Sequence, residues 1–243
     1  MAIYFLSDFH LGEGDAATEA RKLERFKEFI SRSRADLEHL VLLGDLFDFW
    51  FEYRHLIPKR NLQLLFLLRD LLASGVPITY VTGNHDHWIG DFLSVELGIE
   101  VVGDRLELDT GAGKILAMHG DGLAKSDWKY RLLKKVLRNR VCIALYKLLP
   151  PSLAYWLAYG AAQSSRRHTA KRPRDRFLEE YREYGRQMLA GDYCAFICGH
   201  THHPELLRFG EKYFLNTGDW ISHFSYIRFA DGEFQLLSML DQT

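Results

Sequence analysis

The chain has 243 residues, of which 47% are hydrophobic and 26% are charged, and its net charge is −1. These values are ordinary for a folded globular protein of one domain, and they exclude a disordered or low-complexity chain. The three cysteines, Cys142, Cys194 and Cys198, lack the C-x-x-C spacing of a zinc or redox site, so we expect free thiols in a reducing cytosol.

Strands and helices are predicted to alternate in the first half of the chain. Continuous apolar runs predict buried strands, whereas an apolar spacing such as Leu23, Phe26 and Phe29 predicts an amphipathic helix. In chain order we expect a strand at 3–6, a helix with Thr18 as a candidate N-cap, a strand at 40–43, a helix from Pro58 to Gly75, a strand at 77–82 and a short helix at 90–97.

The second half is predicted to contain an insertion and further strands. We expect strands at 101–108 and 114–119 joined by a turn at 111–113, a helical insertion at about 122–176, a helix at 177–189, strands at 195–200 and 213–217, and antiparallel strands within 225–240. The last of these strands are expected to complete a second sheet.

Side chains that can bind metals directly follow five of the predicted strands. In open α/β sheets the ligand crevice lies at the carboxyl ends of the strands, so five such clusters indicate one shared site. The clusters are Asp8-Phe-His10, Gly44-Asp45, Gly83-Asn84-His85-Asp86, His119-Gly-Asp121 and Gly199-His200-Thr-His202.

The clusters have the chemistry of a metal centre. Asp, Asn and His supply oxygen and imidazole ligands, which suit Mn, Fe, Zn or similar divalent ions. Asp8 and His10 lie two residues apart and would face one side of an extended chain, and His200 and His202 repeat this spacing. Seven ligands suit two ions that share one carboxylate, an arrangement that binds both the attacking and the leaving oxygens of a phosphoryl displacement. The seven candidates are Asp8, His10, Asp45, Asn84, His119, His200 and His202.

The order of these motifs resembles that of the calcineurin-like metallophosphoesterase superfamily, and the resemblance extends from residue 8 to residue 202. It implies an α/β fold, a two-sheet β-sandwich flanked by helices with a helical cap insertion. It also implies a phosphoesterase with two divalent ions, expected to be Mn²⁺, with Fe, Zn or Mg as alternatives. The implied ligands are Asp8, His10, Asp45 and His202 for one ion, and Asp45, Asn84, His119 and His200 for the other.

The resemblance further implies how the reaction proceeds. A water molecule activated between the two ions would be the nucleophile. His85 would donate a proton or hydrogen bond to the departing oxygen, and Asp86 would orient His85. Two neighbouring residues receive no catalytic role. For Asp48 a capping or surface role is favoured over a further site role, and His87 is left unassigned, with substrate contact as an alternative.

The insertion at 122–176 concentrates positive charge. It holds 14 Lys and Arg residues against two Asp residues, a net charge of +12, so the rest of the chain carries −13. Apolar residues from Trp128 to Leu148 fall at helical spacing, and Pro150-Pro151 should end that helix before a second apolar stretch at 153–162.

Three interpretations of this insertion are possible. Lys147 and the two prolines interrupt the apolar runs, which argues against a transmembrane span. A solvated helical hairpin remains open. A basic amphipathic lid on an anionic membrane surface, or over an anionic lipid substrate, fits best. Nucleic acid is not expected as a partner, because basic charge alone is only an electrostatic footprint.

The position of the insertion and the length of the chain resemble the branch of the superfamily that cleaves UDP-2,3-diacylglucosamine in lipid A biosynthesis. The resemblance implies hydrolysis to UMP and 2,3-diacylglucosamine 1-phosphate. That branch commonly has Arg directly after the metal-binding Asn, where this chain has His85, and the arginine expected before the cap serine is replaced near Ala161. The implied substrate-binding residues are Asp127, Tyr130, Ser164, Arg167 and Lys171.

Two other functions stay open. One is a related phosphodiesterase or pyrophosphatase that acts on another nucleotide or nucleotide-lipid. The other is a non-catalytic scaffold that kept the fold, although the complete set of candidate ligands argues against it. We expect a cytoplasmic protein, because a strand begins at Ala2 with no basic leader before it. We also expect a monomer, peripheral on the inner face of the cell membrane through its basic apolar insertion.

Overall fold

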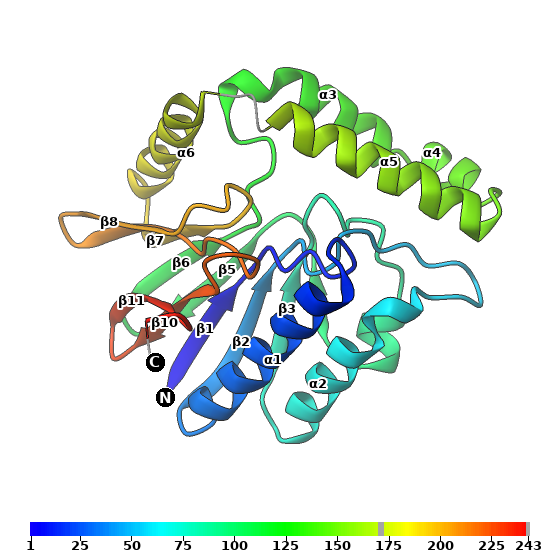
Figure 1. Cartoon of the computed structure of the whole chain (residues 1–243). Coiled ribbons are helices and arrows are strands. Elements are labelled where there is room, and N and C mark those ends of the chain that lie inside the picture. Colours follow the sequence, from blue (N-terminus) through cyan, green and yellow to red (C-terminus); the bar gives the residue numbers. More distant parts are fainter. Residues whose placement is uncertain (170–172, 242–243) are drawn as a thin grey trace.

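Two β-sheets pack face to face and carry helices on their outer faces (Figure 1). This computed structural model describes residues 1–169 and 173–241, and at residues 61 and 163–169 it describes the backbone alone. The predicted α/β architecture of two sheets flanked by helices is confirmed.

The first sheet has six strands in the order β11-β10-β1-β2-β3-β4. Strands β1 to β4 are parallel to one another, and β10 runs antiparallel to both β1 and β11. The strands are Ala2–Leu6 (β1), Leu37–Leu43 (β2), Ile78–Val81 (β3), Glu100–Val102 (β4), Ser225–Ala230 (β10) and Glu233–Ser238 (β11).

The second sheet has five strands in the order β5-β6-β7-β9-β8. Strands β6, β7 and β9 are parallel, and the edge strands β5 and β8 are antiparallel to their neighbours. The strands are Leu106–Thr110 (β5), Gly113–Ala117 (β6), Tyr193–Cys198 (β7), Glu205–Phe209 (β8) and Lys212–Asn216 (β9).

Two expectations about strands are wrong. The strand expected at 101–108 is two strands: β4 pairs with β3 in the first sheet, whereas β5 pairs with β6 in the second. Residues 103–105 carry the chain from one sheet to the other, and apolar content alone does not reveal such a crossing. The antiparallel pair within 225–240 joins the first sheet beside β1, rather than completing the second.

Side chains alternate between two cores along each central strand, which explains why these strands are apolar throughout. Phe5 of β1 packs between the two sheets, against residues such as Ile115 and Ile197. Its neighbours Tyr4 and Leu6 point to the opposite face of the first sheet, where they pack with two helices. The outer face of the second sheet is covered by α6 (Arg174–Leu189).

The two helices on the first sheet are α1 (Ala16–Ser33) and α2 (Leu62–Ala73). The N-cap of α1 is Asp15 rather than the expected Thr18, because the Asp15 carboxylate accepts a 2.8 Å hydrogen bond from the Thr18 amide. A short 3-10 helix, Lys59–Asn61, leads into α2, and the helix expected at 90–97 is a single π-helical turn, Phe92–Glu96.

The insertion forms three helices that lie across the carboxyl ends of the strands (Figure 1). They are α3 (Trp128–Leu137), α4 (Arg140–Tyr146) and α5 (Pro151–Thr169), and we call them the cap. The single helix expected before Pro150 is interrupted at Asn139, whose side chain caps α4 by accepting a 2.8 Å hydrogen bond from the Val141 amide. Within the described parts of the chain, no helix is both long and apolar enough to cross a membrane.

Two helical glycines give a test of the packing between α6 and the second sheet. A Cβ atom on Gly185 would lie 2.3 Å from Phe214 of β9, whereas a Cβ atom on Gly160 of α5 would meet no atom within 4 Å. Gly185→Ala should therefore destabilise the protein by about 1–3 kcal/mol through overpacking. Gly160→Ala should instead stabilise it slightly, because alanine favours the helix. Thermal unfolding measures both, and a stabilising Gly185→Ala would contradict the close packing.

Candidate dinuclear metal centre

Both sheets contribute strand ends to the same site. The parallel strands β1, β2 and β3 lie side by side, so the residues after them, Asp8, Asp45 and Asn84, emerge at one edge of the first sheet. The parallel pair β6 and β7 brings His119 and the His200–His202 segment to the matching edge of the second sheet. All seven candidate ligands therefore lie at the carboxyl ends of strands, as the sequence predicts.

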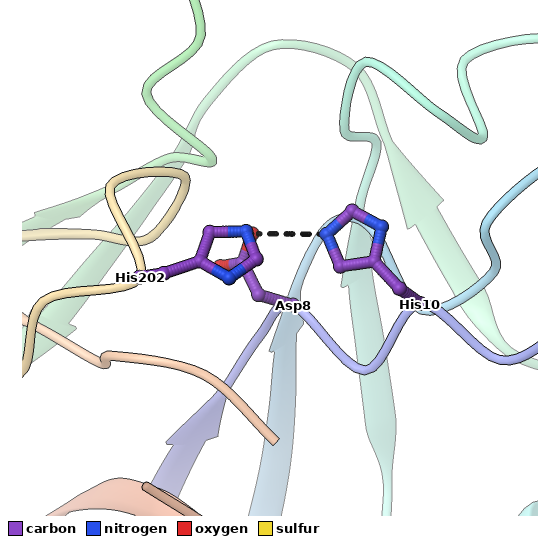
Figure 2. Close-up of side chains that lie close together, drawn as sticks. All are labelled: Asp8, His10 and His202. Atoms are coloured by element: carbon purple, nitrogen blue, oxygen red, sulfur yellow. Dashed lines mark ion pairs between the residues drawn. The ribbon is translucent and has the colours of Figure 1, made fainter. Parts of the chain in front are cut away.

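Asp8, His10 and His202 form one group (Figure 2). The Asp8 Oδ1 atom lies 3.7 Å from His10 Nε2 and 3.3 Å from His202 Nε2. Asp8 and His10 are buried, and the imidazole planes of His10 and His202 are 26° apart with ring centres at 5.1 Å. Three ligand atoms thus converge from two distant parts of the chain.

Asp45, His119 and His200 form a second group, which Asn84 joins. His119 Nδ1 donates to the Leu43 carbonyl oxygen at 2.8 Å, which directs Nε2 into the site. That Nε2 atom lies 3.3 Å from Asp45 Oδ2, 3.1 Å from Asn84 Oδ1 and 3.1 Å from His200 Nδ1. Four ligand atoms therefore surround one small volume.

Asp45 lies between the two groups. Its Oδ2 atom is 3.6 Å from His10 Nε2 in the first group and 3.3 Å from His119 Nε2 in the second. Its Oδ1 atom accepts a 2.9 Å hydrogen bond from the His85 amide, which fixes the orientation of the carboxylate. This is the position that a bridging ligand would need.

The polar atoms of the first group fit a bound cation. Among the described residues, Asp8 Oδ1 and both ring nitrogens of His10 are buried and have no hydrogen-bond partner. Buried polar atoms without partners cost free energy, and a metal ion would satisfy them. Ligands about 2.0–2.2 Å from one ion lie roughly 3–4 Å apart, which matches the separations within both groups.

The backbone is strained at the same residues. Asp8, His10, Asp45, His200 and His202 all have φ between 44° and 64°, although none of them is glycine. Non-glycine residues adopt this left-handed conformation at a cost in free energy, and such residues cluster at functional sites. The packing around the site is also close at Gly83, where a Cβ atom would lie 2.1 Å from Asp45 Oδ1.

The electrostatics of the groups favour cation binding. Burial alone would lower the pKa of His119, but the charge and hydrogen bond of Asp45 raise that pKa to about 10. Burial is likewise outweighed at His10, where Asp48 and Asp8 hold the pKa well above its usual range. Burial and the neighbouring His119 lower the pKa of His200 to about 4. Without metal, the carboxylates therefore draw protons onto two of the imidazoles.

His85 is oriented by Asp48, so the expectation that Asp86 orients it is wrong. His85 Nδ1 donates to the Asp48 carbonyl oxygen at 2.8 Å and lies 3.6 Å from Asp48 Oδ1. The Asp86 carboxylate is fully buried and accepts hydrogen bonds from the Gly83 and Leu46 amides at 2.9 and 2.8 Å, and from the Tyr80 hydroxyl. Asp86 therefore holds the loop that carries the site residues.

Asp48 and Asp219 both contact candidate site residues, although the sequence favours a capping or surface role for Asp48 and assigns no role to Asp219. Asp48 Oδ1 also lies 3.7 Å from His10 Nδ1, so this carboxylate contacts both a candidate ligand and the candidate acid. Asp219 follows β9, and its Oδ2 atom lies 3.6 Å from His202 Nδ1. The available signals were that Asp48 comes three residues after Asp45 and that Asp219 follows a predicted strand, as the other site residues do.

A cavity of about 350 Å³ lies beneath the cap, beside the candidate metal centre. We call it the cap cavity. Asn84, His85 and His87 line it on one side, and mainly apolar side chains of α3 and α5 line it on the other. The cap-side residues include Leu133, Leu137, Leu157, Ala158, Ala161 and Ala162. Burial and the nearby Arg138 lower the pKa of His87 to about 4, so this imidazole is neutral at pH 7.

The five expected substrate-binding residues have different positions. Tyr130 lines the cap cavity, and its hydroxyl donates to Asp121 at 2.8 Å. Asp127 is buried in the turn before α3. The side chains of Ser164 and Arg167 and the whole of Lys171 lie outside the described residues.

Comparison with known proteins agrees with this geometry. The family model described as calcineurin-like phosphoesterase matches residues 1–204. The chain therefore belongs to the calcineurin-like phosphoesterase family, and it is a phosphoesterase enzyme of a fold that implies divalent metals. A solved archaeal phosphodiesterase structure aligns over 98% of this chain and 100% of its own length, with a TM-score of 0.51 at 13% sequence identity. This similarity supports the fold.

Relatives with higher sequence identity to this chain share one specific name. The UDP-2,3-diacylglucosamine hydrolase of Porphyromonas gingivalis is 32% identical to this chain, in an alignment that covers 98% of each protein. Proteins of the same name from Nitrosococcus oceani and Vibrio vulnificus are each 28% identical, over 90% and 96% of this chain and over 88% and 96% of their own lengths. The resemblance noted in the sequence is thus confirmed.

The raised pKa values of His10 and His119 make metal binding dependent on pH. With a pKa of about 10, His119 holds a proton at pH 7.5 without metal and must lose it to become a ligand, and the raised pKa of His10 acts in the same direction. Filling the site with Mn²⁺ should therefore release protons, and the apparent affinity should rise with pH. Calorimetric titration in buffers of different ionisation enthalpy measures this release. Heats that do not depend on the buffer would contradict the assignment.

The contact between Asp48 and His85 predicts coupled effects on catalysis. His85→Ala should lower kcat by about 10²–10⁴-fold, as the loss of a general acid does. Asp48→Asn should lower kcat less, and the double variant should be no slower than His85→Ala alone, because both changes disable the same group. Steady-state kinetics with metal content measured in parallel provide the test. Fully additive losses would show that Asp48 acts independently of His85.

Proposed function

We propose that this phosphoesterase hydrolyses UDP-2,3-diacylglucosamine to UMP and 2,3-diacylglucosamine 1-phosphate. The observation that carries the proposal is the juxtaposition of a candidate two-metal centre with an apolar cavity under the cap. Relatives that align over nearly the whole chain are named for this reaction. The cap cavity gives acyl chains an apolar surface next to Asn84 and His85.

The metal ions would supply an activated water molecule and Lewis-acid stabilisation of phosphate charge. We assign Asp8, His10, Asp45 and His202 to one ion and Asp45, Asn84, His119 and His200 to the other, with Mn²⁺ as the expected metal. His85 would donate a proton or hydrogen bond to the departing phosphate oxygen from Nε2, because its Nδ1 is engaged by the Asp48 carbonyl oxygen.

Charges at the cap cavity support binding of a substrate with an anionic head and apolar chains. Lys134 Nζ lies 2.8 Å from Asp121 Oδ2, and Arg138 forms an ion pair with Asp104. Arg138 Nη2 is buried, lacks a hydrogen-bond partner among the described residues and faces this cavity.

Incubation of the Mn²⁺-loaded protein with UDP-2,3-diacylglucosamine should produce UMP, detected by chromatography. Asp45→Ala should abolish this hydrolysis, because one carboxylate would serve both ions. Hydrolysis of bis-p-nitrophenyl phosphate but not of the nucleotide-lipid would indicate a related phosphodiesterase instead. Full activity of Asp45→Ala would contradict the bridging role.

We also propose that residues 1–243 form a single domain with an insertion at about 122–176. The cap helices belong to this insertion, and we propose that the insertion rests on an anionic membrane surface. Its outer residues include Trp156 and Leu148, which are 69% and 79% exposed, and the insertion carries a net charge of +12. Exposed apolar side chains among basic ones favour binding at the membrane interface.

Sedimentation with lipid vesicles tests this surface. The protein should bind phosphatidylglycerol vesicles better than phosphatidylcholine vesicles, and salt should weaken the binding, because charge screening increases with ionic strength. Trp156→Ser should reduce the bound fraction, whereas Phe66→Ser, at an exposed position on α2, should not. Absence of binding to either kind of vesicle would contradict the proposal.

A further inference from the structure

A second cavity, of about 410 Å³, lies beside the candidate metal centre. Its lining includes Asp48, which contacts the candidate ligand His10, and the cap residues Ser152 and Tyr155. Its volume lies in the range of small-molecule pockets, about 300–1,000 Å³. Phe49 lines both cavities and so lies at the boundary between this one and the cap cavity. We call the second cavity the loop cavity, because residues 48–60 form most of its wall.

Each cavity has a lining residue that contacts the candidate reaction centre. Asp48, in the loop cavity, lies 3.7 Å from His10 and 3.6 Å from His85. Asn84, in the cap cavity, lies 3.1 Å from His119. One cavity therefore approaches the first group of ligands and the other approaches the second.

Cleavage of a diphosphate with two different halves requires such a division. In-line displacement at phosphorus puts the attacking oxygen and the leaving group on opposite sides. The two halves of the substrate lie at the two ends of the scissile bond, one kept on the attacked phosphorus and the other departing, so they extend from it in different directions. If the acyl chains occupy the cap cavity, as the proposed function holds, the other half needs a separate place beside the metal centre.

The loop cavity has the chemistry of a nucleotide pocket. Phe49, Phe51 and Tyr155 supply aromatic surface, and the Arg60 guanidinium lies 6.0 Å from the centre of the Tyr155 ring. Arg60 and Lys59 form no ion pair with a described residue, so their charges are available to a phosphate. In the cap cavity, by contrast, Lys134 and Arg138 are paired with Asp121 and Asp104.

We propose that the loop cavity binds the nucleoside monophosphate half of the substrate, with the base against Tyr155, the phosphate directed toward the candidate metal centre, and Arg60 and Lys59 supplying positive charge for the anionic ligand. Bases stack on aromatic rings and on arginine planes, and arginine pairs with phosphate. An acyl chain would gain nothing from two cations. Tyr53 donates a 3.0 Å hydrogen bond from its hydroxyl to the Leu149 carbonyl oxygen, which ties the wall of the cavity to the cap.

Calorimetric binding of products to the Mn²⁺-loaded protein tests this inference, which rests on the proposed function. Arg60→Gln and Tyr155→Ala should each weaken UMP binding about tenfold, the effect of losing one stacking or phosphate contact. Leu157→Ala, on the same helix as Tyr155 but in the cap cavity, should leave UMP affinity unchanged and weaken binding of 2,3-diacylglucosamine 1-phosphate. Inorganic phosphate should bind all variants equally, which verifies that the metal centre is intact.

The outcomes separate the inference from the proposed function. Unchanged UMP affinity in both Arg60→Gln and Tyr155→Ala would overturn the nucleotide pocket, as would UMP binding no tighter than phosphate in the unaltered protein. If those two variants lose affinity for the lipid product instead, the loop cavity holds an acyl chain and the inference is wrong. Hydrolysis of UDP-2,3-diacylglucosamine by the unaltered protein would still support the proposed function in each of these cases.

Discussion

The main constraint on this structure is a cluster of polar groups that is buried at the strand ends. Their burial is unfavourable for folding unless a ligand compensates for it. Asp8 and Asp45 are buried among four imidazoles, and several of their atoms lack hydrogen-bond partners in the described chain. Five of the seven candidate ligands also have left-handed backbone conformations. Burial of charge and strain of this kind lower stability unless a ligand compensates for them. Divalent cations would compensate both carboxylates and would replace protons on the imidazoles.

The sandwich and the cap have different roles around this centre. The two sheets fix the ligands, because parallel strands from each sheet end at the same edge. The cap and the 48–60 loop add two cavities on either side of Phe49, one mainly aliphatic and one aromatic with unpaired positive charge in the described structure. Phosphoester chemistry would then be set by the sheets, and the choice of substrate by the insertion and the loop.

Much of the site could be predicted because its signals are local in the sequence. Each candidate ligand follows an apolar run that predicts a strand. The end of that run and the type of the next polar residue together indicate the position of the ligand. The role of Asp48 could not be predicted, because it depends on a contact with His85, which lies 37 residues away and follows a different strand. Asp86 is adjacent to His85 in sequence, yet its carboxylate turns into the core toward Tyr80. The split between β4 and β5 was missed because an apolar pattern does not identify the sheet that a strand joins.

Anomalous diffraction from crystals grown with Mn²⁺ tests the central claim most directly. Two peaks about 3.5–4 Å apart are predicted, one within reach of Asp8, His10 and His202 and the other within reach of Asn84, His119 and His200, with the Asp45 carboxylate between them. A single peak, or peaks remote from these side chains, would contradict the account.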